Sequence, residues 1–335
     1  DDHDDHDDHD DHDDHDDHDD HDDHDEHGDH DEHHSEAIVT DYDFTPISVS
    51  AGLVWDFTKG YNLGVSLSRS ERAPSAAELM SFGPHIGTRT YEVGALFKLH
   101  QEHDEAHFDI FDSKIEKEVA NNIDLTLRKT EGNVGFILNA FYNQVDNYYY
   151  QTATDLFAEV THDHGSEHSE GGAHDEHDEH DIHSGELPVY VFTTDDVTLT
   201  GMEAQIAWQV NSEFKTSLFA DYVRAELRHG GDLPRTPPLR VGLQLNYQTE
   251  HINAQLDVVR YDSQDKVAKF ETTTDGYTLV DASVSYDFSV LDKEMSVYLK
   301  GKNLTNTEAR VHTSFLKEVA PRPGRSIDIG VKGYF

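Results

Sequence analysis

Histidine and acidic residues are concentrated in three stretches of this sequence, and together they could bind divalent metal ions. The chain opens with the triplet DDH written eight times, and its first 34 positions hold twelve histidines and twenty-one acidic residues without any lysine or arginine. The segments HQEHDEAH at 100–107 and HDHGSEHSEGGAHDEHDEHDIH at 162–183 have a similar composition. Imidazole and carboxylate ligands suit zinc, nickel and copper, and an unstructured chain can fold several of them around one ion.

The candidate metal ligands are therefore the histidines of these stretches, together with two histidines outside them. The low-complexity candidates are His3, His6, His9, His12, His15, His18, His21, His24, His100, His103, His107, His162, His164, His168, His174, His177, His180 and His183. His85 and His312 lie in more complex sequence and are candidates for a structured site. The alternatives stay open: the opening tract could be a solvated acidic tail or an unselected repeat expansion, and His85 and His312 could be packing residues.

The composition excludes several classes of protein. The formal net charge is −44, so nothing would neutralise phosphates and binding to nucleic acid is not expected. The chain has no cysteine, which rules out a disulfide scaffold, thiolate ligands and thiol catalysis. We find no catalytic constellation and no G-x-S-x-G motif, so we expect neither an enzyme nor a prosthetic group. Among the metals that these residues could bind, zinc or another divalent ion such as nickel is expected, and the scarcity of sulfur ligands disfavours copper.

The rest of the chain alternates apolar and polar residues with period two. In LRVGLQLNYQ at 239–248, Leu239, Val241, Leu243, Leu245 and Tyr247 share one face. We count eleven such strands, several long enough to cross a bilayer when tilted. Their ranges are 46–57, 61–71, 116–128, 134–150, 190–208, 214–228, 239–249, 252–262, 277–288, 295–303 and 325–335. No run of 18 apolar residues predicts a transmembrane helix, and the N-terminus lacks the features of a signal peptide.

The connections between these strands alternate strictly between short and long. The short ones are at 58–60, 129–132, 211–213, 249–251 and 291–294, and the long ones are at 72–115, 151–189, 229–238, 263–276 and 304–324. Aromatic residues accompany the short turns, namely Trp55, Phe57, Tyr61, Trp208, Tyr247, Phe288, Tyr334 and Phe335. This layout is typical of outer-membrane barrels, whose long loops face outward. We therefore predict an all-β, antiparallel transmembrane β-barrel; the alternative is a soluble all-β protein whose aromatic residues fill a core.

The number of predicted strands indicates whether this chain could close a barrel. Single-chain bacterial barrels have an even number of strands, and an open sheet edge is not tolerated in lipid. Eleven strands that begin from an external segment therefore predict the second part of a larger barrel.

Three segments resemble a known family. They are SRSERAPSAAELMSFGPHIGTRTYEVG at 68–94, EKEVANNIDLTLR at 116–128, and VYLKGKNLTNTEARVHTSFLKEVAPRPGRSIDIGVKGYF at 297–335. Together they resemble the C-terminal barrel portion of TonB-dependent outer-membrane receptors, and the acidic, histidine-rich loops with HTSFLKEVAPRPGR resemble the zinc-uptake group. On this reading residues 1–36 are a low-complexity external segment, and residues 37–335 are the C-terminal part of the receptor barrel.

The resemblance implies location, architecture and function. It implies a 22-stranded barrel in the outer membrane of a Gram-negative bacterium, in contact with lipid and closed by a plug through which the TonB complex acts. The sequence shows neither plug, nor TonB box, nor the first half of the barrel. The expected function is TonB-dependent uptake of a divalent metal, most simply zinc, captured by the histidine-rich loops. The alternative is a truncated or passive barrel that binds and buffers metal at the surface without import.

Overall fold

The structure is a computed structural model that describes residues 42–102, 105–110, 115–159, 186–291 and 293–333. The chain divides into two units, Asp1–Asp43 and Phe44–Phe335, and the elements described below belong to the second. The opening tract lies outside the described residues, as do residues 160–185. Within the described ranges, no helix combines the length and the apolar character needed to cross a membrane.

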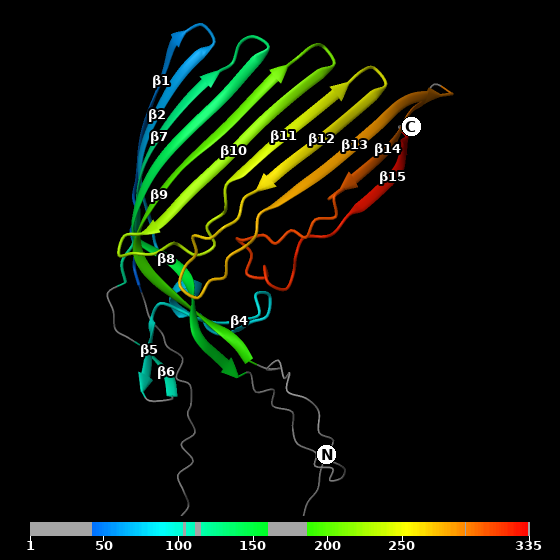
Figure 1. Cartoon of the computed structure of the whole chain (residues 1–335). Helices are drawn as coiled ribbons and strands as arrows, with labels where there is room; N and C mark the ends of the chain where they lie inside the picture. Colours follow the sequence, from blue (N-terminus) through cyan, green and yellow to red (C-terminus); the bar gives the residue numbers. More distant parts are fainter. Residues whose placement is uncertain (1–41, 103–104, 111–114, 160–185, 292, 334–335) are drawn as a thin grey trace, which may run out of the picture. The chain divides into compact units, whose positions relative to one another are not determined.

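Eleven long strands form one antiparallel sheet in which each strand pairs with the next long strand along the chain (Figure 1). They are β1 (Ser48–Thr58), β2 (Tyr61–Arg72), β7 (Glu118–Lys129), β8 (Val134–Glu159), β9 (Glu186–Gln209), β10 (Phe214–Leu227), β11 (Arg240–Gln248), β12 (Ile252–Tyr261), β13 (Tyr277–Val290), β14 (Lys293–Lys302) and β15 (Ser326–Gly333). These strands match the eleven ranges predicted from alternation. The all-β, antiparallel prediction is confirmed.

The register of the sheet aligns the apolar residues of successive strands. One row of paired positions runs across six strands and contains only apolar residues: Phe136, Ile206, Leu218, Leu243, Val258 and Val280. The adjacent row carries Ala207, Ser217, Gln244, Asp257 and Asp281 on the opposite face. Because a slip of one residue would exchange the two faces along a whole strand, this patterning fixes the register.

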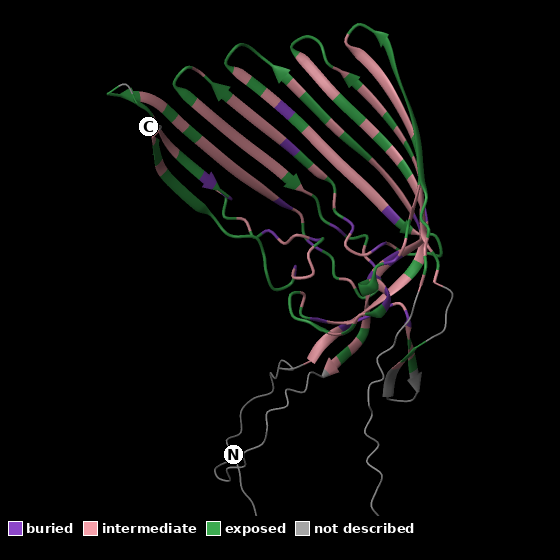
Figure 2. Ribbon diagram, turned by 180° about the vertical axis from the view of Figure 1, so that it is seen from behind, coloured by how far each residue is buried: buried purple, intermediate pink, exposed green. Residues whose placement is uncertain are grey.

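The apolar face of the sheet has no second layer over it among the described residues. Leu53 is 69% exposed, Leu218 48% and Ile329 78%. Figure 2 shows exposed and intermediate residues along the strands, with buried residues gathered toward the long-loop end. A soluble sandwich would cover such a face with another sheet or with helices, so the soluble alternative does not account for this one.

The two ends of the sheet differ as predicted. Short turns such as 59–60 and 210–213 join strands at one end, and the long connections join them at the other (Figure 1). Trp55 and Trp208 lie at the short-turn end, away from the long loops, and both are largely exposed. The predicted aromatic residues Tyr334 and Phe335 lie outside the described residues.

The long connection at 72–115 contains structure that the sequence patterns did not predict. It holds the helix α1 (Ala76–Met80) and four short strands: β3 (Phe82–His85), β4 (Thr90–Val93), β5 (Phe97–Glu102) and β6 (Glu105–Ile110). The helix begins at a capping box in which Ser75 accepts from the Glu78 backbone N–H and the Glu78 carboxylate accepts from the Ser75 backbone N–H. Strands of four to six residues are too short to give a clear periodic pattern.

Strands β8 and β9 extend further than predicted. They contain 26 and 24 residues, and beyond their neighbours they pair only with each other over 148–159 and 186–195, apart from a short parallel contact with β4 at Val189–Val191. We call this two-stranded extension the β8–β9 ribbon. A two-stranded hairpin alone is only marginally stable, so the added β4 strand is expected to support it.

The two edge strands are not paired with each other. Among the described residues, β1 pairs only with β2 and β15 only with β14. The sheet of this chain is therefore open at β1 and β15.

Three aromatic residues on the polar face lie directly opposite glycines on neighbouring strands. Phe141 faces Gly201, Phe219 faces Gly242, and Tyr298 faces Gly330. A Cβ atom added at Gly242 would lie 2.1 Å from Cζ of Phe219, and Gly201 and Gly330 show similar conflicts with their partner rings. Each ring therefore occupies space that only glycine leaves open.

Replacing Gly242 with alanine should lower the free energy of unfolding of the protein in detergent micelles by about 1–3 kcal/mol, because Phe219 must move. Urea titration followed by tryptophan fluorescence measures this change. Gly64→Ala is the matched control, since its nearest neighbours would lie 3.8 Å away in ordinary contact. Adding Phe219→Leu to Gly242→Ala should recover part of the loss. Equal stability of Gly242→Ala and Gly64→Ala would show that the ring–glycine contact contributes nothing.

Candidate functional site

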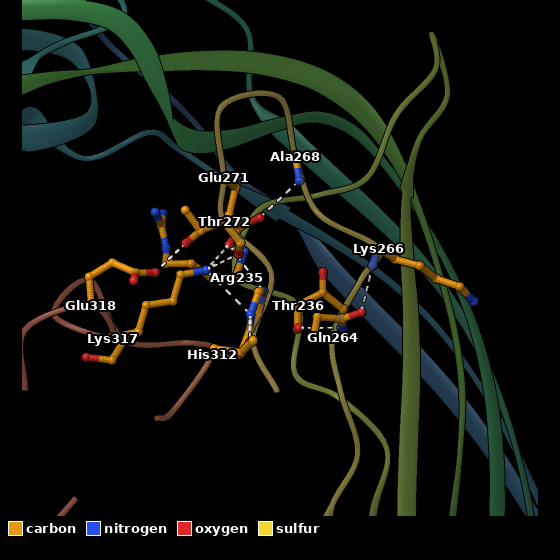
Figure 3. Close-up of polar contacts among 12 residues, drawn as sticks. Arg235, Thr236, Gln264, Lys266, Ala268, Glu271, Thr272, His312, Lys317 and Glu318 are labelled. Carbon is orange, nitrogen blue, oxygen red and sulfur yellow. Dashed lines mark hydrogen bonds and ion pairs between the residues drawn. The ribbon is translucent and has the colours of Figure 1, made fainter. Parts of the chain in front are cut away.

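Three long loops meet in a buried polar cluster at the long-loop end of the sheet (Figure 3). The loops connect β10 to β11 (228–239), β12 to β13 (262–276) and β14 to β15 (303–325). The buried polar residues they contribute include Thr236, Gln264, Thr274, His312 and Lys317. Because all three loops leave the sheet at the same end, residues that are distant in the sequence are brought together. We call this set, with Glu271 and Arg235, the loop cluster.

Glu271 is the acceptor at the centre of the loop cluster. Its Oε1 atom accepts from the Arg235 backbone N–H at 2.9 Å, and its Oε2 atom accepts from the Ala268 backbone N–H at 3.0 Å. Burial alone would raise the pKa of Glu271. The contact with His312, the two backbone donors and the Lys317 charge outweigh burial and lower the pKa to about 2. The carboxylate is therefore ionised at any physiological pH.

His312 lies between Glu271 and Thr274, and its side chain is 1% exposed. Its Nε2 atom is 3.2 Å from Oε1 of Glu271, although among the described residues it has no well-aligned hydrogen-bond partner. Its Nδ1 atom forms a short contact with the Thr274 hydroxyl. A neutral imidazole protonated at Nε2, with Nδ1 accepting from Thr274, is the tautomer that suits both neighbours.

Lys317 adds a buried ammonium group to the same cluster. Its Nζ atom donates to the Thr272 carbonyl at 2.6 Å and lies 3.5 Å from both Oε1 of Glu271 and Nδ1 of His312. Burial lowers the pKa of Lys317, while the Glu271 charge acts in the opposite direction. A positive charge this close to the imidazole disfavours a second cation there, so the chemistry of the site favours loop cross-linking over metal coordination.

Further hydrogen bonds join the first two loops. Gln264 Nε2 donates to the Thr236 carbonyl at 2.9 Å, and within the second loop Gln264 and Thr274 exchange backbone hydrogen bonds of 2.9 and 3.1 Å. Arg235 reaches the β8–β9 ribbon, donating to the Gln151 carbonyl at 3.1 Å while its guanidinium stacks 3.8 Å above the Phe315 ring. The loop cluster thus connects three loops and the base of the ribbon.

Three cavities lie at or beside the loop cluster. One of about 270 Å³ is lined by residues that include Thr274 and His312. A smaller one, of about 140 Å³, is lined by residues that include Arg235, Glu271, Phe315 and Lys317. The largest, of about 620 Å³, lies beside the ribbon and is lined by Leu99, Tyr150, Thr152, Ala153, Thr154, Asp155, Leu156, Val191, Leu227, Gly230, Gly231, Asp232, Val267, Ala268, Lys269 and Phe270. This largest cavity has room for a small organic molecule.

The structure places the predicted metal-site residues in different environments. His312 is buried in the loop cluster, whereas His85 is exposed in β3, with Nδ1 contacting the Thr88 hydroxyl at 2.8 Å. His100 is exposed in β5, with Nε2 3.9 Å from Oδ2 of Asp109. His107 lies in β6, opposite His100 in the register. His103 and the predicted ligands at 3–24 and 162–183 lie outside the described residues.

Metal-ligating side chains do not gather in the part of the molecule that the structure describes. There, no three histidine, aspartate or glutamate side chains are close enough to hold an ion. The side chains of residues 101–107 are outside this statement.

Sequence reasoning identified His312 but missed its partners Glu271, Lys317, Arg235 and Gln264. Each is an isolated polar residue in a loop, separated from His312 by up to 77 positions of sequence (235 to 312). The segment HTSFLKEVAPRPGR contains both His312 and Lys317 and was the one available indication. Nothing in residue spacing indicates that Glu271 lies beside them.

Substituting Glu271 with glutamine should loosen all three loops together, because it leaves the buried Lys317 ammonium without its counter-charge. Breaking a buried ion pair costs about 3–5 kcal/mol, so amide hydrogen exchange in 228–239, 262–276 and 303–325 should accelerate in parallel. Glu308→Gln is the control: it removes an exposed pair with Arg310 and should change exchange by at most about 1 kcal/mol. Faster exchange confined to 262–276 would contradict a shared cluster.

The stability that Glu271 adds to the loop cluster should also depend on pH, and the direction of this dependence follows from its pKa. The pKa of Glu271 in the folded protein is about 2, below the ordinary value of 4.5. Between these two pH values the unfolded loop therefore binds more protons than the folded loop does. The stabilising effect of Glu271 is therefore complete above about pH 4.5 and is lost as the pH falls toward 2. The difference between the wild type and Glu271→Gln in the free energy of loop opening, measured by amide hydrogen exchange, should be constant from pH 7 to 5 and shrink below pH 4.5. A difference that disappears between pH 7 and 5 would contradict this assignment.

Residues 8–304 match the family described as TonB dependent receptor-like, beta-barrel. Among solved structures, the chain is similar to the copper transporter OprC, with a TM-score of 0.60 and 17% identity over 85% of this chain and 38% of that one. The FrpB iron transporter from Neisseria meningitidis gives a TM-score of 0.53 and 11% identity over 86% and 39%. A mutant of the ferric enterobactin receptor PfeA from Pseudomonas aeruginosa gives 0.56 and 16% over 86% and 40%.

These identities show a shared fold and nothing finer. The chain spans about two fifths of the length of these solved structures.

Proposed function

Because the chain belongs to the TonB-dependent receptor β-barrel family, and so to the outer membrane of a Gram-negative bacterium, we propose that it supplies barrel strands and external loops to a receptor for divalent metal uptake. Zinc is the favoured ion. Members of this family are transporters, and the proposal contains no catalytic step. Energy for import would come from the TonB complex, the proposed partner inside the cell envelope.

The distribution of histidine is the observation that carries this proposal. Of the 26 histidines, 25 lie in the opening tract or on the long-loop side of the chain's topology. His251, at a short turn, is the exception. The segment 160–185 joins the ends of β8 and β9 that lie at the long-loop end, and in outer-membrane barrels this end faces outward. Histidine would therefore be placed where metal arrives.

Capture by these loops has a simple physical basis. Many weak His, Asp and Glu sites close together raise the effective ligand concentration, so an ion that leaves one site is retained by the next. The net charge of −44 also attracts cations toward the protein before contact. The ion would then pass inward along the polar face of the sheet.

The loop cluster has a supporting role in this proposal. His312 is held by Thr274 and Glu271 and lies beside the Lys317 ammonium, so we assign it to fixing the loops. His85, which contacts Thr88 and is exposed, stays in the proposed ligand set with the low-complexity histidines.

Uptake of a metal chelate is a second candidate. The cavity of about 620 Å³ beside the ribbon favours it, because Tyr150, Phe270 and Lys269 would suit an organic anion with aromatic groups. A third possibility is surface binding and buffering of metal without import. The three readings differ in whether free zinc is accumulated and whether TonB is required.

Uptake of radioactive zinc by cells that depend on this protein tests the proposal. Changing the seven histidines of 162–183 to glutamine and removing residues 1–34 should lower the initial rate at scarce zinc by roughly fivefold or more, with little effect at saturating zinc. His251→Gln and His229→Gln serve as controls outside these tracts and should leave the rate unchanged.

The alternatives predict other results. Loss of TonB should abolish uptake; uptake that persists would contradict active import and favour a passive barrel. Zinc bound at the surface but never accumulated would favour buffering. An uptake rate that is insensitive to the histidine changes and competed by a ferric chelate would favour the second candidate.

A further inference from the structure

The apolar face of the sheet ends, toward the long loops, in a row of residues that contains no carboxylate. Side chains alternate between the two faces along each strand, so the first polar residue after the apolar run can be read strand by strand. In seven strands this residue is Arg69 (β2), Asn121 (β7), Gln144 (β8), Thr200 (β9), Arg224 (β10), Arg260 (β12) or Thr278 (β13). We call these seven residues the rim row. They include three arginines, although the net charge of the chain is −44.

Carboxylates of the same face lie one step further from the apolar run. Glu71, Glu226 and Asp262 each follow an arginine of the rim row by two residues. Glu71 is in turn paired with Lys117, whose Nζ atom lies 2.5 Å from Oε2 of Glu71. Positive charge thus lies next to the apolar run, and negative charge lies beyond it.

Two arginines of the rim row keep donors available for a ligand. The side chains of Arg69 and Arg260 are each 52% exposed. Arg69 donates one N–H to Oδ1 of Asn121 at 2.9 Å, and its Nη2 atom is 4.0 Å from Oε1 of Glu71. Nη2 of Arg260 is 3.9 Å from Oδ1 of Asp262. Both ion-pair separations exceed hydrogen-bond length, and a guanidinium has five N–H donors, so each arginine can still bind an anion.

Lys266 brings a third cation to the same border. It belongs to the loop between β12 and β13, and its Nζ atom lies 3.4 Å from the hydroxyl of Tyr222. Tyr222 is the last residue of the apolar run of β10, and Arg224 follows it on the same face. Arg224 donates to Asp232 and Glu226, so it is already occupied. Lys266 is exposed and therefore supplies the available positive charge beside this strand.

We infer that Arg69, Arg260 and Lys266 form a docking surface for the phosphate groups of membrane lipids, whose acyl chains cover the apolar face. Headgroup phosphates lie just outside the hydrocarbon region, at the level where the apolar run of each strand stops. A guanidinium binds phosphate oxygens through two parallel hydrogen bonds. Carboxylates at this level would repel the same phosphates, and the chain carries them one step further away. This inference concerns the lipid and is independent of which substrate the protein takes.

Native mass spectrometry of the full chain, purified in detergent and titrated with dioleoyl phosphatidic acid, tests this inference. Each of Arg69→Gln, Arg260→Gln and Lys266→Gln should weaken lipid binding about fivefold, and the triple variant should weaken it roughly 100-fold, as expected for one charged contact per residue. Lys215→Gln is the matched control, because Lys215 lies in β10 on the polar face of the same sheet. This control should leave the affinity unchanged.

Two further ligands separate the possible sources of phosphate. Dioleoylglycerol has the same chains without a phosphate and should bind at least about tenfold more weakly than phosphatidic acid. Inorganic phosphate at millimolar concentration should not displace the lipid, because it lacks the chains that contact the apolar face. Displacement by inorganic phosphate would identify a site for the free anion and overturn lipid docking. Equal binding of dioleoylglycerol, or a triple variant that binds phosphatidic acid like the wild type, would show that these three residues do not recognise the headgroup.

Discussion

The antiparallel hydrogen-bond ladder from β1 to β15 is the constraint on which the rest of this structure depends. In a membrane, backbone N–H and C=O groups find no water, so strands must satisfy one another, and each strand is fixed in register by its neighbours. That register places an apolar row such as Phe136, Ile206 and Leu218 on one face and polar residues on the other. It also sends every long connection to the same end of the sheet. The long loops lie next to one another because the strands that they connect are neighbours in the sheet.

The long-loop end combines two kinds of chemistry. The loop cluster is compact, and Glu271, His312 and Lys317 neutralise and anchor one another within it. The histidine-rich segments have the opposite composition, with many ligands and few apolar residues. In the proposed receptor, a fixed framework beside the histidine-rich segments would limit ordering costs to the groups that bind the metal.

Sequence patterns predicted the strands far better than the site. Period-two alternation found all eleven long strands because an apolar residue on one face recurs at every second position over eight or more positions. It found none of β3 to β6, whose lengths of four to six residues give too few repeats. It also ended β8 early, at 150, since polar residues such as Thr152, Thr154 and Asp155 interrupt the pattern where the ribbon leaves the sheet, and it began β9 late, at 190. Glu271 and Lys317 were not predicted as partners of His312, because a loop contact depends on the three-dimensional path and leaves no period in the sequence.

The β8–β9 ribbon has a consequence for the kinetics of encounter. Its two strands run about twelve residues beyond the pairing of their neighbours, a rise of roughly 40 Å at about 3.3 Å per residue. The rate at which a diffusing solute meets a target grows with the linear size of the target. In the proposed receptor, the ribbon would hold the two points where segment 160–185 joins β8 and β9 away from the rest of the sheet, and so enlarge the radius over which that segment could meet a solute. Extra strand length would thus act on the arrival rate, a quantity that additional ligands at the sheet's own rim would change little.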